Sequence, residues 1–238
     1  MAYNVFGDPI ENSTLKGMPE YKCKAIEKKD RAKVALQMKN VGDKDLNAIT
    51  FVENLKQQHG DGISTRCLIY NATGETLTYA ISKDWWGQIG PSPYPALIAN
   101  GQWGAFLHVQ KLGTFEGSVA TVVYKGTNKD GQVHGWLLAW SNNRVAYKNT
   151  VDYFRFGSYS LSNYRSMLPW SNNGIAGKNM SRTATHYLDN VDWIPLIYDY
   201  VNKSGINKSE TWNGCFSTVS TGSGTSPIVE AIFMLEDA

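Results

Sequence analysis

Two periodicities divide the chain. From Lys24 to Met38, apolar residues recur among charged ones with the spacing of an amphipathic helix. A second helix is predicted after Gly42, because residues 48–55 place five apolar side chains on one helical face, and the HGDG segment at 59–62 ends it. Residues 1–18 carry little periodicity and predict an irregular arm. We expect both helices to pack against the core of the protein.

After Gly62 the pattern alternates between apolar and polar residues, as it does in β-strands. The segment ISTRCLIY-NATG-ETLTYAIS predicts a hairpin with its turn at NATG. Both faces of the strand at 135–141 are apolar, which indicates a central strand that is covered on both sides. Further strands are predicted at 103–110, 118–125 and 151–156, and in the two closing segments CFSTVST and SPIVEAIFML.

Many short strands and few helices predict a mainly β protein, an antiparallel β-sandwich with two N-terminal helices and one short late helix at 192–201. We expect residues 1–62 to form the arm and the two helices, and residues 63–238 to form the sandwich, within one folded unit. The residues 157–183 and the segment SGINKSETWNGC are predicted to be loops.

Charge, hydropathy and cysteine content limit the partners and the compartment that we expect for the protein. The formal net charge is +2, so no strong field favours an acidic partner, and we expect no nucleic acid to bind. Residues 1–20 lack the basic start and apolar run of a secretion signal, and no segment reaches the about 20 apolar residues of a membrane helix. Three widely spaced cysteines argue against a disulfide framework. Together these features predict a cytoplasmic protein.

Motifs for catalysis or metal binding are absent from the sequence. It contains no nucleophile elbow, phosphate loop or dinucleotide fingerprint, and its four histidines match no zinc spacing. His108 and His134 could face each other across neighbouring strands, but a structural role is the simpler interpretation. Cys215 has no base beside it in sequence and is interpreted as a half-buried free thiol. We therefore expect no enzyme, no catalytic residue, no metal and no cofactor.

Aromatic residues supply the main functional clue. Twenty-five of the 29 lie after residue 62, and all eight tryptophans are among them. Those in strand patterns are predicted to lie in the core: Trp103, Phe106, Tyr124, Trp136 and Trp140. Others fall beside turns or on the late helix, where rings tend to reach solvent and can hold a cation or a sugar. This second group contains Trp85, Trp86, Tyr94, Tyr147, Trp170, Tyr198, Tyr200 and Trp212.

Seven segments resemble the jasmonate-induced stress proteins of plants in their order and spacing: DGISTRCLIYNATGETLTY, DWWG, PYP, NGQWGAFLHV, VVYKG, LAWS and TWNGC. The resemblance spans nearly the whole chain. It implies a role in induced defence or salt stress, and it supplies a context more than a mechanism.

A more distant resemblance concerns architecture. The strand before NATGET, the strand GSVATVVY, the segment LLAWSNNRVAYKN, a short helix and the strand IVEAIFML resemble, in this order, actinoporins and related sphingomyelin-binding mushroom lectins. The resemblance implies a cytolysin/lectin β-sandwich with a phosphocholine pocket, in which Ser141, Tyr147 and Tyr200 match family positions. Ala146 and Leu196 replace aromatic residues of that family, and its RGD triplet is missing. These departures argue against full pore formation.

One leading hypothesis and several alternatives result. The leading hypothesis is a non-catalytic, stress- or defence-related protein that binds a phosphocholine-like lipid headgroup or a glycan through an aromatic pocket, with peripheral contact to a membrane. The alternatives are a homo-oligomeric interaction protein, a pore-former in which residues 47–58 detach, and an unrecognised hydrolase. The ligand-binding residues predicted by the leading hypothesis are Trp85, Trp86, Tyr94, Ser141, Tyr147 and Tyr200.

Overall fold

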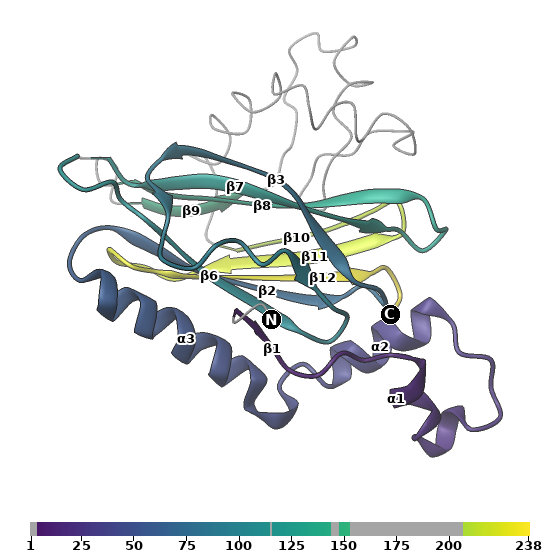
Figure 1. The fold of residues 1–238 in the computed structure, drawn as a ribbon. Helices are drawn as coiled ribbons and strands as arrows, with labels where there is room; N and C mark the ends of the chain where they lie inside the picture. The colour runs from purple at the N-terminus through teal and green to yellow at the C-terminus, as the bar shows by residue number, and fades with distance from the viewer. Residues whose placement is uncertain (1–3, 115, 144–147, 153–206) are drawn as a thin grey trace, which may run out of the picture.

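The computed structural model describes residues 4–114, 116–143, 148–152 and 207–238. In this part of the chain two β-sheets pack face to face, and helices cover the outer face of one of them (Figure 1). This arrangement confirms the β-sandwich that the alternating pattern predicted. The predicted late helix at 192–201 and the predicted loop at 157–183 lie outside the described residues.

Sheet A, which lies between the helices and the second sheet, has the strand order β1–β6–β2–β12–β11–β10, with β4 paired to β6. Its central strands β2 (Ser64–Ala72) and β12 (Ile228–Leu235) run parallel, whereas its other described pairs are antiparallel. The remaining strands of sheet A are β1 (Val5–Phe6), β4 (Gln88–Ile89), β6 (Trp103–Val109), β10 (Asn207–Trp212) and β11 (Cys215–Thr221).

Sheet B is antiparallel, with the order β5–β3–β7–β8–β9. The central part of β8 is apolar on both faces, as the sequence predicted, and its side chains from Trp136 to Trp140 are all buried. Trp136, Leu138 and Trp140 belong to the core between the sheets. The strands of sheet B are β3 (Leu77–Trp86), β5 (Leu97–Ile98), β7 (Ser118–Thr127), β8 (Val133–Asn143) and β9 (Lys148–Asp152).

The predicted hairpin between β2 and β3 is wrong. β2 pairs with β6 and β12 in sheet A, and β3 pairs with β5 and β7 in sheet B. The NATG segment is therefore an arch that carries the chain from one sheet to the other. The Asn71 side chain holds the arch, because its Nδ2 donates to the carbonyl oxygens of Glu75 and Ile98, both at 2.7 Å, and its Oδ1 accepts from the Thr73 N–H at 2.9 Å.

Gly74 of this arch should tolerate no side chain. Its φ is +81°, and a Cβ would collide with the carbonyl oxygen of Lys28. Gly131 is the matched control, because its φ is +75° and a Cβ there would meet nothing within 4 Å. We expect Gly131→Ala to lower the free energy of unfolding by about 1 kcal/mol through backbone strain alone, and Gly74→Ala to lower it by clearly more. Urea denaturation measures both losses, and equal losses would show that the close approach to Lys28 is unimportant.

Three helices lie between β1 and β2 in the chain: α1 (Asn12–Lys16), α2 (Lys28–Gln37) and α3 (Lys44–His59). Short 3₁₀ turns at Pro19–Tyr21 and Val41–Asp43 connect them. α2 and α3 confirm the two predicted helices, and α3 ends at His59 with Gly60 as its C-cap, within the predicted stop segment. The arm is more regular than predicted, since it contains β1 and α1.

Two other predictions need correction or remain open. The segment SGINKSETWNGC was predicted to be a loop, but it contains the edge strand β10. Because its polar residues do not alternate with apolar ones, the sequence pattern did not indicate a strand. The predicted strand at 151–156 overlaps β9, and residues 153–156 lie outside the described residues.

Alternate residues of β2 face two different cores. Cys67 and Ile69 pack between the sheets, whereas Leu68 and Tyr70 pack against the helices. The five aromatic residues that were predicted to lie in the core are all buried, which confirms that prediction. They are Trp103, Phe106, Tyr124, Trp136 and Trp140.

Lysines from both long helices reach into the sandwich. Lys28 Nζ on α2 lies 3.0 Å from Glu75 Oε1 and donates to the carbonyl oxygen of Thr127 at 2.6 Å. Lys44 Nζ at the start of α3 donates to the carbonyl oxygen of Gly101 at 2.8 Å, and burial lowers its pKa. Release of residues 47–58, as the pore-forming alternative requires, would expose the buried side chains of Ala48, Val52 and Leu55. The domain boundary at residue 62 stays a prediction.

Candidate functional site

Trp85 and Trp86 occupy the last two positions of β3, and both are partly exposed. The register of β3 against β7 shifts between Asp84 and Trp86, so Trp85 is the extra residue of a β-bulge. Gly87 follows with a φ of +89° and turns the chain toward β4. The two rings therefore lie at a strand end, where the sequence had indicated a turn.

Trp86 and Ser141 lie on the same face of sheet B. Trp86 pairs with Val119 of β7, and Val119 pairs with Ser141 of β8. Directly paired residues project from the same side of a sheet, so the three side chains form a row across β3, β7 and β8. Ser141 and Val119 are buried, whereas Trp86 is partly exposed. The structure thus brings these two predicted site residues together.

Tyr94 lies on the other face of sheet B, where it is partly exposed and packs against the core between the sheets. Its ring stacks on Tyr79 at 5.7 Å and meets Phe106 edge-on at 4.8 Å. Its hydroxyl donates to Asp84 Oδ1 at 3.2 Å, and burial raises its pKa above the ordinary value. The remaining predicted site residues, Tyr147 and Tyr200, lie outside the described residues, and a common pocket for all six stays a prediction.

A polar network missed by sequence reasoning joins the two sheets beside these rings. His108 Nδ1 lies 2.8 Å from Ser118 Oγ, and its Nε2 lies 3.2 Å from Asp84 Oδ1. The order Asp–His–Ser is that of a hydrolase triad. Its members come from β3, β6 and β7, so no sequence spacing could have signalled it. Asp84 is partly exposed, whereas His108 and Ser118 are fully buried.

The hydrogen bonds of Ser118 argue against a nucleophile. Its Oγ accepts from Trp140 Nε1 at 3.2 Å and lies 2.7 Å from Thr65 Oγ1, in addition to His108. A neutral His108 satisfies the whole set, with Nε2–H donating to Asp84 and Nδ1 accepting from Ser118. Burial lowers the pKa of His108, although Asp84 opposes the shift. The network is a structural bridge that holds sheet A to sheet B, which confirms the structural interpretation of His108.

His134 and Cys215 also lie in the interior. His134 is on β8 of sheet B, not on a strand next to His108, so the two histidines do not face each other. Cys215 is a free, buried thiol, and burial raises its pKa to about 12. A thiol that stays protonated at neutral pH is a poor nucleophile, as expected from the sequence, although Cys215 is fully buried and not half-buried.

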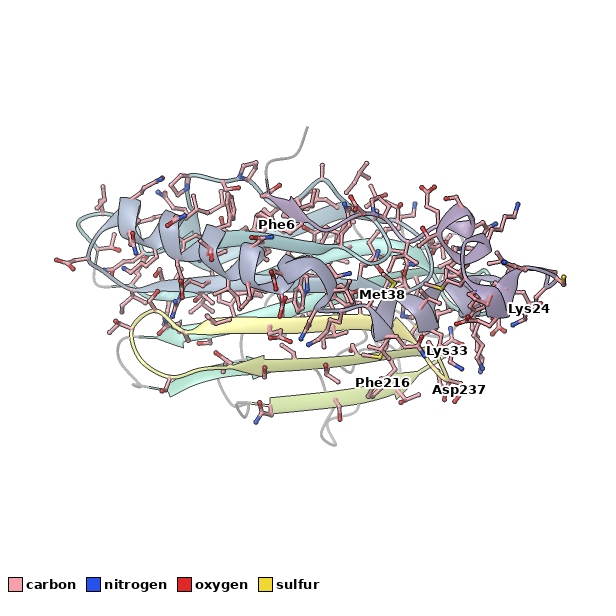
Figure 2. The ribbon with its side chains drawn as sticks, turned by 90° about the horizontal axis from the view of Figure 1, so that it is seen from below. Phe6, Lys24, Lys33, Met38, Phe216 and Asp237 are labelled. Carbon is pink, nitrogen blue, oxygen red and sulfur yellow. The ribbon has the colours of Figure 1, made fainter. Side chains whose placement is uncertain are left out.

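A polar groove lies on the outer face of sheet A, beyond the edge of the helices. Figure 2 shows β10, β11 and β12 side by side next to the helical layer. The groove has a volume of about 470 Å³. Lys39 Nζ of the helical layer lies 3.2 Å from Glu230 Oε1 at its border. The lining residues are Asn207, Ser209, Thr218, Val219, Ser220 and Glu230.

No group of three or more His, Cys, Asp or Glu side chains is placed to hold a metal ion in the described ranges. Among the helices of those ranges, none is both long and apolar enough to cross a bilayer.

A two-sheet sandwich with a helical layer on one sheet and a buried polar bridge between the sheets defines the fold class of the described part. The chain belongs to the Nakanori-like protein family, whose model matches residues 6–164 and 159–236. The solved structure of the lipid-binding protein Nakanori is similar over 96% of this chain and 98% of that one, with a TM-score of 0.72 and 27% identity. A lectin of Xerocomus chrysenteron matches 72% of this chain and 98% of its own, at 14% identity and a TM-score of 0.42.

Curated relatives confirm the jasmonate-induced family. The 23 kDa jasmonate-induced protein of Hordeum vulgare is 48% identical over 142 residues, which are 59% of this chain and 67% of that protein. A jasmonate-induced protein homolog of Atriplex canescens is 31% identical over 104 residues, which are 44% of this chain and 53% of that protein. The chain therefore matches about half the length of the second relative.

Proposed function

We propose that the protein is a non-catalytic, stress- or defence-related binding protein that recognises a phosphocholine-like lipid headgroup. The observation that carries the proposal is the similarity to Nakanori, a lipid-binding protein, at 27% identity over 96% of this chain. The jasmonate-induced relatives support the stress setting. None of these relatives is named as an enzyme, which supports a binding function.

Trp85 and Trp86 support a headgroup site at the end of β3. Aromatic faces attract quaternary ammonium groups, and one such contact contributes about 0.5–2 kcal/mol. Two partly exposed tryptophans at adjacent positions offer such faces, and Ser141 lies in the same row as Trp86. We propose that Tyr147 and Tyr200 complete the pocket, as the actinoporin resemblance implies. Peripheral contact with the bilayer surface would follow.

Removal of either tryptophan ring should weaken binding to choline-bearing vesicles. For Trp85→Ala and Trp86→Ala we expect about threefold to tenfold weaker binding to sphingomyelin or phosphatidylcholine vesicles, because each variant loses one cation–π contact. Vesicle co-sedimentation over a range of lipid concentrations measures the change. Vesicles of phosphatidylethanolamine, which lacks the quaternary ammonium, should bind less of the wild-type protein.

Phe216→Ala is the control for ring removal. Phe216 lies on β11 of sheet A, where it is half-buried and packs with the helical cluster (Figure 2), whereas Trp85 and Trp86 lie on β3 of sheet B. Its removal should leave vesicle binding unchanged, and circular dichroism should show that all three variants are folded. A folded wild-type protein that binds none of these vesicles would refute the lipid proposal.

A glycan is the second candidate ligand, and the groove on sheet A favours it. Hydroxyl, amide and carboxylate groups from three neighbouring strands line the groove, and sugars are bound by such mixed donors and acceptors. Pairing places Asn207 beside Ser220 and Ser220 beside Glu230, so these side chains form one row. A glycan array tests this candidate. Binding that Ser220→Ala or Glu230→Gln weakens would support it, and an array with no positive glycan would count against it.

A further inference from the structure

A second cavity lies at the opposite end of β3 from Trp85 and Trp86. Its volume is about 390 Å³, within the range of about 300–1,000 Å³ that is usual for small-molecule sites. The arm before α1, helix α2, the β2–β3 arch and the turn between β5 and β6 meet around it (Figure 1). The lining residues are Pro9, Ile10, Glu11, Asn12, Arg31, Gly74, Glu75, Thr76, Ala99 and Asn100.

The backbone around the cavity is held in place. Asn100 is buried, and its Nδ2 donates to the carbonyl oxygens of Ile10 at 2.9 Å and Arg31 at 3.1 Å. Its Oδ1 accepts from the Gly74 N–H at 2.9 Å, and its own carbonyl oxygen accepts from the Ile10 N–H at 2.8 Å. One asparagine thus joins the arm, α2 and the arch, so the cavity exists without a ligand.

Arg31 is the fixed cation of this cavity. Its Nε donates to the carbonyl oxygen of Gly74 at 2.8 Å, and its Nη1 donates to Asn12 Oδ1 at 2.8 Å. Both partners are neutral, and no described carboxylate forms an ion pair with Arg31. Nη2 makes no hydrogen bond to the described residues. The guanidinium is therefore oriented, but its charge is not matched by the residues that orient it.

The two carboxylates that line the cavity do not neutralise Arg31. Glu75 Oε1 is engaged by Lys28 Nζ at 3.0 Å and by the Thr127 hydroxyl at 2.7 Å. Glu11 is exposed, so water and salt screen its charge. The cavity combines an oriented guanidinium with the apolar side chains of Pro9, Ile10 and Ala99.

We infer that this cavity binds a small organic carboxylate, with its carboxylate on Arg31 and its apolar body against Ile10, Pro9 and Ala99. A guanidinium matches the planar geometry of a carboxylate and binds it through paired hydrogen bonds. The inference is independent of the lipid proposal, since the cavity shares no residue with the rings at the far end of β3.

Benzoate is a suitable probe, because it combines a carboxylate with a compact apolar ring. We expect a saturable shift of the Arg31 Nε–H signal in ¹H–¹⁵N spectra of the whole protein when benzoate is added. Inorganic phosphate, which offers oxygens without an apolar body, should bind more weakly. Phosphate binding as tight as that of benzoate would overturn the assigned ligand class, and no saturable shift with either compound would overturn the site.

Arg31→Gln should weaken benzoate binding by about tenfold or more, because a charge-assisted pair is lost. Lys33→Gln is the matched control: it removes one positive charge from the same helix, but Lys33 is exposed and does not line the cavity (Figure 2). We expect Lys33→Gln to bind benzoate like the wild type, with backbone amide shifts as the common readout. Equal affinities for the wild type and Arg31→Gln would contradict the inference.

Ala99→Leu tests the site without changing Arg31. The larger side chain should fill part of the cavity and weaken benzoate binding while leaving the hydrogen bonds of Arg31 in place. This variant decides the matter if Arg31→Gln does not fold. A folded Ala99→Leu variant with wild-type affinity would show that benzoate binds elsewhere.

Discussion

Trp140→Ala should lower the free energy of unfolding by about 3–5 kcal/mol, as large-to-small changes at fully buried aromatic positions do. The Trp140 ring packs on Phe106 at 5.8 Å and on His108 at 5.3 Å, within the core between the sheets. Its Nε1 also donates to Ser118 Oγ at 3.2 Å, so the substitution removes one support of the Asp84–His108–Ser118 bridge. Equilibrium urea unfolding followed by circular dichroism measures the loss.

Two further variants separate the loss of apolar packing from the loss of the indole hydrogen bond and supply an exposed control. Trp140→Phe keeps most of the apolar packing but removes the indole N–H, and we expect a smaller loss of about 1–3 kcal/mol. Leu112→Ala changes a side chain that is 89% exposed and should alter stability by no more than about 0.5 kcal/mol. A loss for Trp140→Ala as small as that for Leu112→Ala would show that the two sheets are not held together at this position.

Acid should destabilise the protein through His134 before most carboxylates titrate. Burial lowers the pKa of His134 from 6.5 to about 4, and the nearby charge of Lys28 acts in the same direction. Because the folded-state pKa is the lower one, the unfolded chain takes up this proton first as the pH falls. The contribution of neutral His134 is complete above about pH 6.5 and is lost progressively toward pH 4, which removes about 3 kcal/mol.

His134→Gln should flatten this dependence, because glutamine carries no titratable group. We expect the stability difference between the wild type and His134→Gln to shrink as the pH falls from about 7 to 4.5 in urea titrations. His59→Gln is the control, since His59 is only half-buried at the end of α3 and should change the slope little. Parallel pH profiles for the wild type and His134→Gln would mean that His134 does not titrate in this range.

Local patterns predicted the elements better than their pairing. The 3.6-residue period before residue 62 identified α2 and α3, and the two apolar faces of β8 identified a strand covered on both sides. The pairing of β2 failed because NATG has turn chemistry that suits an arch between sheets as well as a hairpin within one. The deciding interactions, such as Asn71 with Ile98, lie far apart in sequence.

The candidate site was predicted only in part, again because local patterns do not show which distant residues meet. The position of Trp85 and Trp86 next to Gly87 indicated exposed rings, and the rings are partly exposed, although a β-bulge rather than a turn positions them. Tyr94 stands among prolines and suggested exposure, and it is partly exposed, but its ring packs on Tyr79 and Phe106 on the opposite face of sheet B from Trp86. No sequence pattern indicated a site at Arg31, because four segments that are separate in sequence form its cavity.

The parallel pair of β2 and β12 determines when the protein can fold during synthesis. β12 follows the other described strands of sheet A in the chain, yet it occupies the middle of that sheet, between β2 and β11. Until residue 235 has emerged, sheet A exists as two separate parts, β1–β6–β2 and β11–β10, and β2 has one unpaired edge. Such an edge invites pairing with other chains. Synthesis of β12 therefore joins the two parts of sheet A and covers the open edge of β2 in one step.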